Sequence, residues 1–228
     1  MNIFAVIVAA GSGERFGGRP KQLAPLSGMP MLAWSVKRLG DRRNITGLVC
    51  VVPPRGGDDI RGGLEGFGVG DIDAWPEGGE TRQESVRNGL AALPPEATHV
   101  LIHDAARPCV TERLISRLTD ALRDHDAVVP VTPAVDTLVH VEGDSVDRVV
   151  DRSHIAGVQT PQAFELGLIR RAHAAAKDTG TTASDDGSLV LALGERLATV
   201  EGERMNIKVT YAEDMAIADA ILMLETRE

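Results

Sequence analysis

The chain has few aromatic residues, no excess of positive charge and no long apolar run. Phe, Trp and Tyr make up 3% of its 228 residues, which argues against the base-stacking surfaces of single-strand-binding proteins. The formal net charge is −9, whereas a general nucleic-acid binder is usually basic. No apolar stretch approaches the roughly 20 residues that a bilayer-spanning helix requires. We therefore expect neither nucleic acid nor a membrane as a partner.

Cysteine is nearly absent as well. Cys50 and Cys109 are too few for a disulfide framework. The first apolar residues lack a basic leader and run into a glycine loop, so we expect no secretory signal. A reduced, cytoplasmic setting follows as the expectation. The length suits one large α/β domain over residues 1–228, and no long linker or internal repeat divides it.

Strand-like and helix-like segments alternate through the first part of the chain. Apolar, β-rich runs predict strands at 3–8, 47–52, 98–103 and 127–131. Apolar residues at helical spacing predict helices at 31–39 and 111–124, the second capped by Thr111. This alternation predicts a doubly wound, mostly parallel α/β sheet. Such sheets bind their ligands at the carboxyl ends of the strands.

Residues 135–150 interrupt that alternation. Strand-like segments at 136–141 and 145–150 flank the turn sequence Glu142-Gly143-Asp144, which predicts a β-hairpin arm over residues 134–152. An inserted hairpin packs on its own chain or reaches a partner, and the pattern slightly favours the partner.

The rest of the chain is predicted to be largely helical. We expect a poor helix in the glycine-rich connection at 56–70, and helices at 165–177, 185–193 and 213–224. Ser184 is the expected cap of the second of these last three, and Ile217, Ile221 and Leu224 share one face of the third. Short strands are expected at 196–200 and 207–210.

A glycine-rich loop with two nearby cations follows the first predicted strand. Residues 9–17 are AAGSGERFG and residues 20–23 are PKQL, so Arg15 and Lys21 lie close together. Glycine N–H groups can approach a phosphate, and two fixed cations can neutralise it. The spacing fits neither a Walker A loop nor a dinucleotide-binding fingerprint. A glycine loop alone is equally compatible with an ordinary strand-to-helix turn, but the two cations favour a triphosphate site.

Two segments near predicted strand ends carry further polar residues. Asp104 follows the strand at 98–103, where one carboxylate can hold Mg²⁺ against phosphate oxygens. The alternative role for Asp104 is that of a turn or cap residue. Arg107, three positions further on, can pair with a carboxylate or a phosphate. Lys208 stands alone among apolar residues, a pattern that is usually a solvated edge charge.

The segment GGETRQESVR at 78–87 opens a predicted helix after a glycine pair. Its backbone N–H groups and Ser85 are suited to contact a polar edge such as a base. Thr81 and Glu84 also fit an ordinary capping box. For this segment alone, the capped helix is the favoured interpretation.

These motifs occur in a fixed order along nearly the whole chain. The order is AAGSGER, PKQL, GGETRQESV, HDAARP, VDTL, VDR, QTPQAF, SDDGS and NIKVT. The ordered set closely resembles the 2-C-methyl-D-erythritol 4-phosphate cytidylyltransferases of non-mevalonate isoprenoid biosynthesis. The resemblance implies a Rossmann-like nucleotidyltransferase that transfers a cytidylyl group from CTP to 2-C-methyl-D-erythritol 4-phosphate (MEP). The products are 4-diphosphocytidyl-2-C-methyl-D-erythritol and pyrophosphate, and the implied cofactor is Mg²⁺.

Two alternatives stay open beside that activity. The first is the same chemistry on another polyol phosphate, such as ribitol 5-phosphate. The second is a nucleotide-binding module without catalysis. An NAD-dependent oxidoreductase is disfavoured by the spacing of the loop.

The resemblance also implies a role for each matching residue. The catalytic cations match Arg15, Lys21 and Lys208, and the magnesium ligand matches Asp104. The positions around the nucleotide are Ala10, Gly11, Gly79, Glu80 and Ser85. The positions around the acceptor are Arg107, Thr137, Arg152 and Thr160. The family's arm crosses a homodimer, so Thr137 and Arg152 are expected to serve the partner's site.

Overall fold

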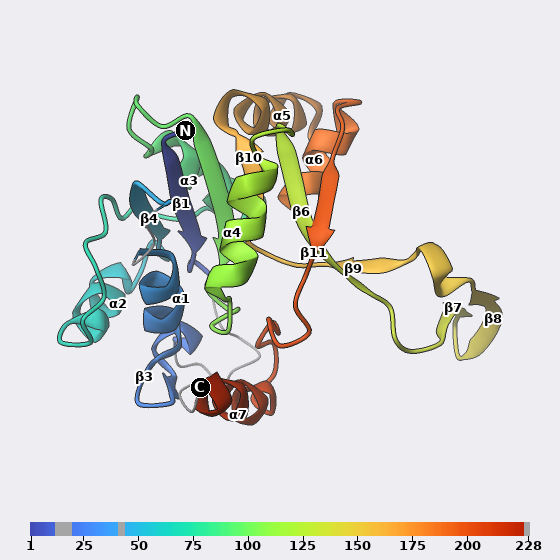
Figure 1. Cartoon of the computed structure of the whole chain (residues 1–228), viewed down its shortest axis with the longest axis horizontal. Coiled ribbons are helices and arrows are strands. Elements are labelled where there is room, and N and C mark those ends of the chain that lie inside the picture. Colours follow the sequence, from blue (N-terminus) through green and yellow to red (C-terminus); the bar gives the residue numbers. More distant parts are fainter. Residues whose placement is uncertain (12–19, 41–43, 226–228) are drawn as a thin grey trace.

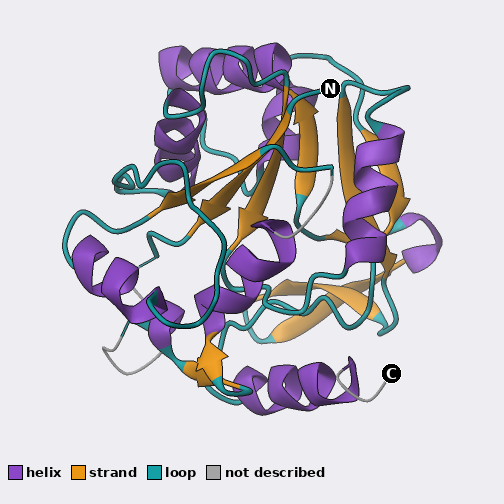
Figure 2. Ribbon diagram, turned by 60° about the vertical axis from the view of Figure 1, so that its left-hand side comes forward, coloured by secondary structure: helices purple, strands orange, loops and turns teal. Residues whose placement is uncertain are grey.

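The structure, a computed structural model, describes residues 1–11, 20–40 and 44–225. Within these ranges, helices cover both faces of one seven-stranded sheet (Figures 1 and 2). Its strands are β1 (Ile3–Val8), β4 (Gly47–Val51), β5 (His99–Asp104), β6 (Ala127–Pro133), β9 (Ala156–Val158), β10 (Gln162–Glu165) and β11 (Ala198–Glu201). The order is β11-β6-β10-β5-β1-β4, with β9 beside β6. The predicted doubly wound, mostly parallel fold is confirmed.

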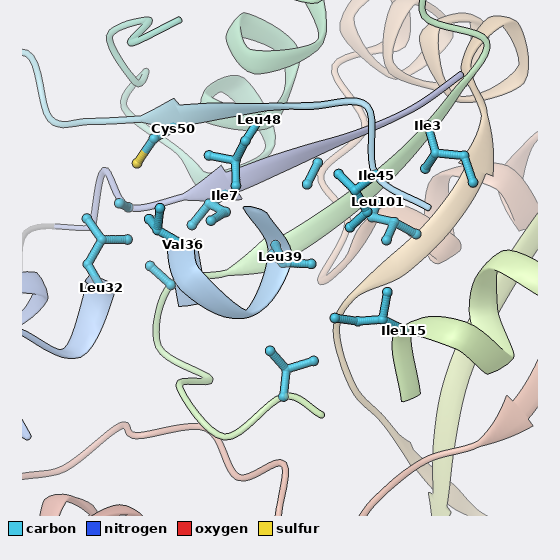
Figure 3. Close-up of a cluster of buried hydrophobic side chains, with 14 of the residues drawn as sticks. Ile3, Ile7, Leu32, Val36, Leu39, Ile45, Leu48, Cys50, Leu101 and Ile115 are labelled. Atoms are coloured by element: carbon cyan, nitrogen blue, oxygen red, sulfur yellow. The ribbon is translucent and has the colours of Figure 1, made fainter. Parts of the chain in front are cut away.

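One face of the sheet is covered by α1 (Met31–Gly40), α2 (Gly57–Leu64) and α4 (Glu112–Ala121). Figure 3 shows side chains of α1 against those of the sheet strands, all buried in one cluster; the labelled residues include Leu32, Val36, Leu39, Ile7, Leu48 and Leu101. The other face is covered by α3 (Arg82–Ala91), α5 (Leu166–Thr179) and α6 (Asp186–Ala192). Burial on both faces explains why the strands are continuous apolar runs.

The last helix, α7 (Asp214–Glu225), lies beyond the carboxyl ends of β1 and β11 (Figure 1). Its Ala218, Ile221 and Leu222 pack on a third buried cluster. The helix itself was predicted correctly. The prediction of its buried face was partly wrong, because Ile217 and Leu224 are exposed. The helix is apolar on more than one side, so the spacing of its apolar residues could not select the buried face.

Other sequence predictions need correction at particular residues. Residues 207–210 form no strand, and β10 was not predicted. The cap of α6 is Asp185 rather than Ser184, since the Asp185 carboxylate accepts a bond from the Ser188 N–H at 3.0 Å. The caps Thr111 of α4 and Thr81 of α3 are confirmed.

The inserted hairpin consists of β7 (Leu138–Glu142) and β8 (Ser145–Val150), joined through Gly143 at a positive φ of 60°. These strands form a two-stranded sheet of their own. Figure 1 shows the hairpin at the end of an extended connection, away from β1 and β5. The described part of the chain also contains four short elements: η2 (Lys21–Leu23), β2 (Pro25–Leu26), β3 (Met29–Pro30) and η3 (Arg152–His154).

No helix in the described ranges combines the length and the apolar composition that crossing a bilayer requires.

Candidate active site

The carboxyl ends of β1 and β5 lie side by side, because these strands pair in parallel with Val8 opposite Asp104. β10 runs antiparallel to β5, with Gln162 opposite Ile102, so the residues just before β10 reach the same edge. The Asp104 N–H donates to the Thr160 hydroxyl at 3.0 Å. Sheet topology therefore brings together residues that are 96 and 56 positions apart in the sequence.

Asp104 lies between two cations. Arg82 Nε donates to Asp104 Oδ1 at 2.9 Å, and Lys208 Nζ donates to Oδ2 at 2.6 Å. Burial by itself would raise the pKa of this carboxyl, but Arg82 and Lys208 outweigh that effect and hold it well below its usual range. Asp104 is thus a carboxylate at neutral pH, as a metal ligand must be.

Arg82 belongs to the motif GGETRQESV, but the sequence predicts no role for it. Its guanidinium also donates from Nη1 to Asp186 at 2.9 Å. Only its position at the start of a helix, just after a glycine pair, could have marked it in the sequence. The sequence likewise predicts no role for Asp186, which belongs to the motif SDDGS.

The segment that carries Lys208 is tied to two loops, one that follows Asp104 and one that precedes β10. Arg107 Nη1 donates to the Asn206 carbonyl at 2.7 Å, and Asn206 Nδ2 donates to the Thr160 carbonyl at 2.9 Å. The Val209 N–H donates to the Ala106 carbonyl at 2.8 Å. These bonds, rather than a strand, place Lys208.

Lys21 reaches the same segment from η2. Its ammonium donates to the Val209 carbonyl, so two of the three predicted catalytic cations, Lys21 and Lys208, are brought together. Arg15, the third, lies outside the described residues.

Two partly buried guanidinium groups at this edge each have one buried nitrogen without a hydrogen-bond partner among the described residues. Arg82 Nη2 and Arg107 Nε are buried and have no hydrogen-bond partner within the described residues. Unpaired buried donors are costly, and phosphate oxygens are suitable acceptors for them. The arrangement favours an anionic ligand.

The predicted nucleotide residues form a second group beside Asp104. A Cβ on Gly78 would lie 2.3 Å from Ala10 Cβ and 2.8 Å from Ser85 Oγ, so only glycine allows this close approach. The Gly79 N–H donates to the Ser85 hydroxyl at 3.2 Å, and that hydroxyl donates to the Thr81 carbonyl at 2.9 Å. Ser85 therefore organises the loop, while Glu80 is exposed.

A cleft of about 480 Å³ opens next to this group. It is lined by Ala10, Gly11, Pro20, Gln22, Pro53, Pro54 and Arg55. Gln22 has no predicted role, yet its amide donates to the Gly11 carbonyl at 2.8 Å and so holds the start of the glycine loop.

The structure does not bring Thr137 and Arg152 to Asp104. Both are exposed on the arm, and the Arg152 guanidinium donates to the Val135 carbonyl of the same arm. Within the described ranges, no hydrogen bond or ion pair joins either side chain to Asp104, Lys208 or Arg107.

His103 is buried directly before Asp104. Its ring contacts the Thr160 hydroxyl at 3.2 Å and the Arg107 carbonyl at 3.1 Å. Burial lowers the pKa of His103 to about 4, so the ring is neutral at pH 7. It supports the surrounding loops, as expected for a core histidine.

The side chains at this edge fit Mg²⁺ held jointly with a ligand's phosphates. In the described part of the chain, no group of three or more His, Cys, Asp or Glu side chains could bind a metal alone. Mg²⁺ needs only one or two carboxylates when phosphate oxygens and water complete its shell. Asp104 supplies one, and the side chain of its partner Lys208 is 46% exposed.

Comparison with known proteins identifies the family. The family profile described as "IspD: 2-C-methyl-D-erythritol 4-phosphate cytidylyltransferase" matches residues 3–224. The chain belongs to this cytidylyltransferase family. It is 40% identical over 223 residues to the 2-C-methyl-D-erythritol 4-phosphate cytidylyltransferase of Geobacillus thermodenitrificans, covering 97% of each protein. Membership confirms the predicted enzyme class, a nucleotidyltransferase.

Solved structures of the cytidylyltransferase family show the same fold. The enzyme from Thermus thermophilus is 37% identical with a TM-score of 0.80, over 96% of this chain and 98% of that one. A bifunctional IspD/IspF enzyme from Sphingopyxis alaskensis is 44% identical over 96% of this chain. The chain spans 55% of the length of that bifunctional relative.

Proposed function

We propose that the edge around Asp104 is the catalytic site for transfer of a cytidylyl group from CTP to MEP, which yields 4-diphosphocytidyl-2-C-methyl-D-erythritol and pyrophosphate. The observation that carries the proposal is the ionised Asp104 between Lys208 and Arg82 in a chain of this family. The nucleotide is assigned to Ala10, Gly11, Gly79, Glu80 and Ser85. The acceptor is assigned to Arg107 and Thr160, with Thr137 and Arg152 from an arm.

The chemistry requires charge neutralisation rather than a general base. The nucleophile is a phosphate monoester whose second pKa is about 6, so it is largely dianionic at neutral pH. None of the six histidines is needed to remove a proton. The obstacle is the approach of two anions, and catalysis consists of positioning them and screening their charge.

The cations at the edge are suited to that task. Lys21 contacts the segment that carries Lys208, and Arg15 precedes Lys21 in the sequence. We assign these three residues to the phosphates of CTP and to the charge that develops on the transferred phosphorus. Mg²⁺ bound by Asp104 would supply further positive charge to the triphosphate.

We also propose that the protein acts as a homodimer through its arm. Val139, Val141, Val146 and Val149 of the arm are 41–67% exposed. The pairs Val139–Val149 and Val141–Val146 lie opposite each other in the hairpin, so they form one apolar face. An uncovered apolar face favours a partner surface. A second copy would explain why Thr137 and Arg152 stand away from their own chain's Asp104.

An assay with paired acceptors tests the activity. Pyrophosphate release is measured with CTP and either MEP or ribitol 5-phosphate, with Asp104→Asn as the inactive control. We expect rapid release with MEP and little with ribitol 5-phosphate. The opposite preference would reassign the acceptor, and no release with either would favour a nucleotide-binding module.

A further inference from the structure

A buried Asp–His contact lies behind Arg82, and the proposed chemistry does not use it. Asp186 of α6 accepts a bond from Arg82 Nη1 at 2.9 Å and lies 3.1 Å from His173 Nε2 of α5. The side chains of Asp186 and His173 are 1% and 2% exposed. A carboxylate buried to this degree is costly unless its partners satisfy it.

The guanidinium of Arg82 is shared between two carboxylates. Nε faces Asp104 Oδ1, whereas Nη1 faces Asp186. Because the guanidinium is planar, fixing Nη1 on Asp186 also fixes the direction in which Nε points. Asp104 Oδ2 is thereby left to Lys208.

Without Asp186, the same guanidinium could turn to bind both oxygens of Asp104 in a fork. Such bidentate Arg–carboxylate pairs are a strong and common geometry. That pair would occupy Oδ2 and neutralise the carboxylate more fully. Asp104 would then be a weaker ligand for a cation.

We propose that Asp186, held by His173, is a positioning residue that keeps Arg82 on one oxygen of Asp104 and leaves the other available to the metal–nucleotide complex. The inference rests on the proposed function, because it requires Asp104 to bind a cation together with CTP. Asp186 acts through Arg82 and touches no substrate. Partners of this kind change metal affinity or activity by about 10–100-fold when they are removed.

The coupling between metal and CTP provides a readout that needs no turnover. CTP binding is measured by calorimetry without acceptor, once with MgCl₂ and once with EDTA, and the ratio of the two dissociation constants is the coupling. We expect Asp186→Asn to reduce this ratio by about 10–100-fold. The matched control is Asp185→Asn, which removes a carboxylate on the adjacent residue that contacts Ser188 and Gln162 instead of Arg82.

A second pair of variants tests the role of His173 should Asp186→Asn fail to fold. His173→Gln retains an N–H donor toward Asp186, while His173→Phe removes it at similar bulk. We expect the coupling to be preserved in the glutamine variant and reduced in the phenylalanine variant. Equal coupling in both variants, or equal loss in Asp185→Asn and Asp186→Asn, would show that the Asp186–His173 contact only ties α5 to α6.

The wild-type protein and Asp104→Asn separate the two proposals. Coupling in the wild type that disappears in Asp104→Asn supports the proposed metal site. If that holds while Asp186→Asn behaves as wild type, the inference about Asp186 is wrong and the proposed function stands. If the wild type shows no coupling, the metal site fails, and the positioning role of Asp186 fails with it.

Discussion

Single residues at the candidate site acquire their meaning from partners that are distant in sequence. Asp104 alone resembles a turn residue, and Lys208 alone resembles a solvated edge charge. Their 2.6 Å contact across 104 residues of chain makes both parts of one charged cluster. The same holds for Arg82, which joins Asp104 to Asp186.

Removing either lysine of the cluster should impair turnover without unfolding the protein. We expect Lys21→Ala and Lys208→Ala to lower kcat by about 10²–10³-fold, as losses of other preorganised charges do. Steady-state assays with thermal unfolding measure both effects, and Lys177→Ala on exposed α5 surface is the control. Full turnover in either variant would remove that lysine from the mechanism.

The two cysteines should be inert in the native protein. Both are buried, and burial raises the pKa of Cys109 to about 12 and that of Cys50 beyond its usual range. A thiol is reactive only as an accessible thiolate. A thiol-specific colorimetric reagent at pH 8 should detect neither thiol before denaturant is added and both afterwards. Rapid labelling of the folded protein would contradict this.

At the scale of elements, the spacing of apolar residues predicted an element correctly where that element buries an apolar face of its own. α4 begins at a capping Thr111 and buries Leu114 and Leu118, as its spacing predicts. β10 was missed because it has four residues and is defined by neighbours on both sides, β5 and β6. Residues 207–210 have a strand-like pattern, but they bond to loops instead of a sheet.

The cap of α4 offers a test at this scale. The Thr111 hydroxyl accepts from the Leu114 N–H at 3.2 Å and donates to the buried Glu203 at 2.6 Å. Thr111→Ala should lower the free energy of unfolding by about 1–3 kcal/mol, since both bonds are lost. Thr111→Ser keeps the hydroxyl and should cost much less in the same urea titration. Equal loss in both variants would assign the effect to the methyl group.

At the scale of the whole molecule, the arm separates two predicted acceptor residues from the rest of the site. Thr137 and Arg152 lie on or beside the hairpin that Figure 1 shows away from the strand ends. The proposed dimer would reunite them with Asp104 of the other copy.

Mixing two defective variants tests this exchange. Arg152→Ala and Lys208→Ala chains are refolded together and assayed at low MEP concentration, with each variant refolded alone as the control. If Arg152 serves the partner's site, half of the dimers are mixed and each contains one intact site. Activity should then recover to about a quarter of wild type. No recovery, despite mixed dimers verified by mass, would place Arg152 in its own chain's site.

The sequence by itself determined the alternating order of the elements, the caps of α3 and α4 and the motif set that marks the family. These depend on spacing and local bonding, which are written along the chain. Tertiary structure decided the antiparallel β10, the inner face of α7 and the grouping of Asp104 with Arg82, Lys208 and Asp186. Such contacts join residues that are far apart in the sequence, and only the packing of the sheet, its helices and the loops at its edge sets them close together.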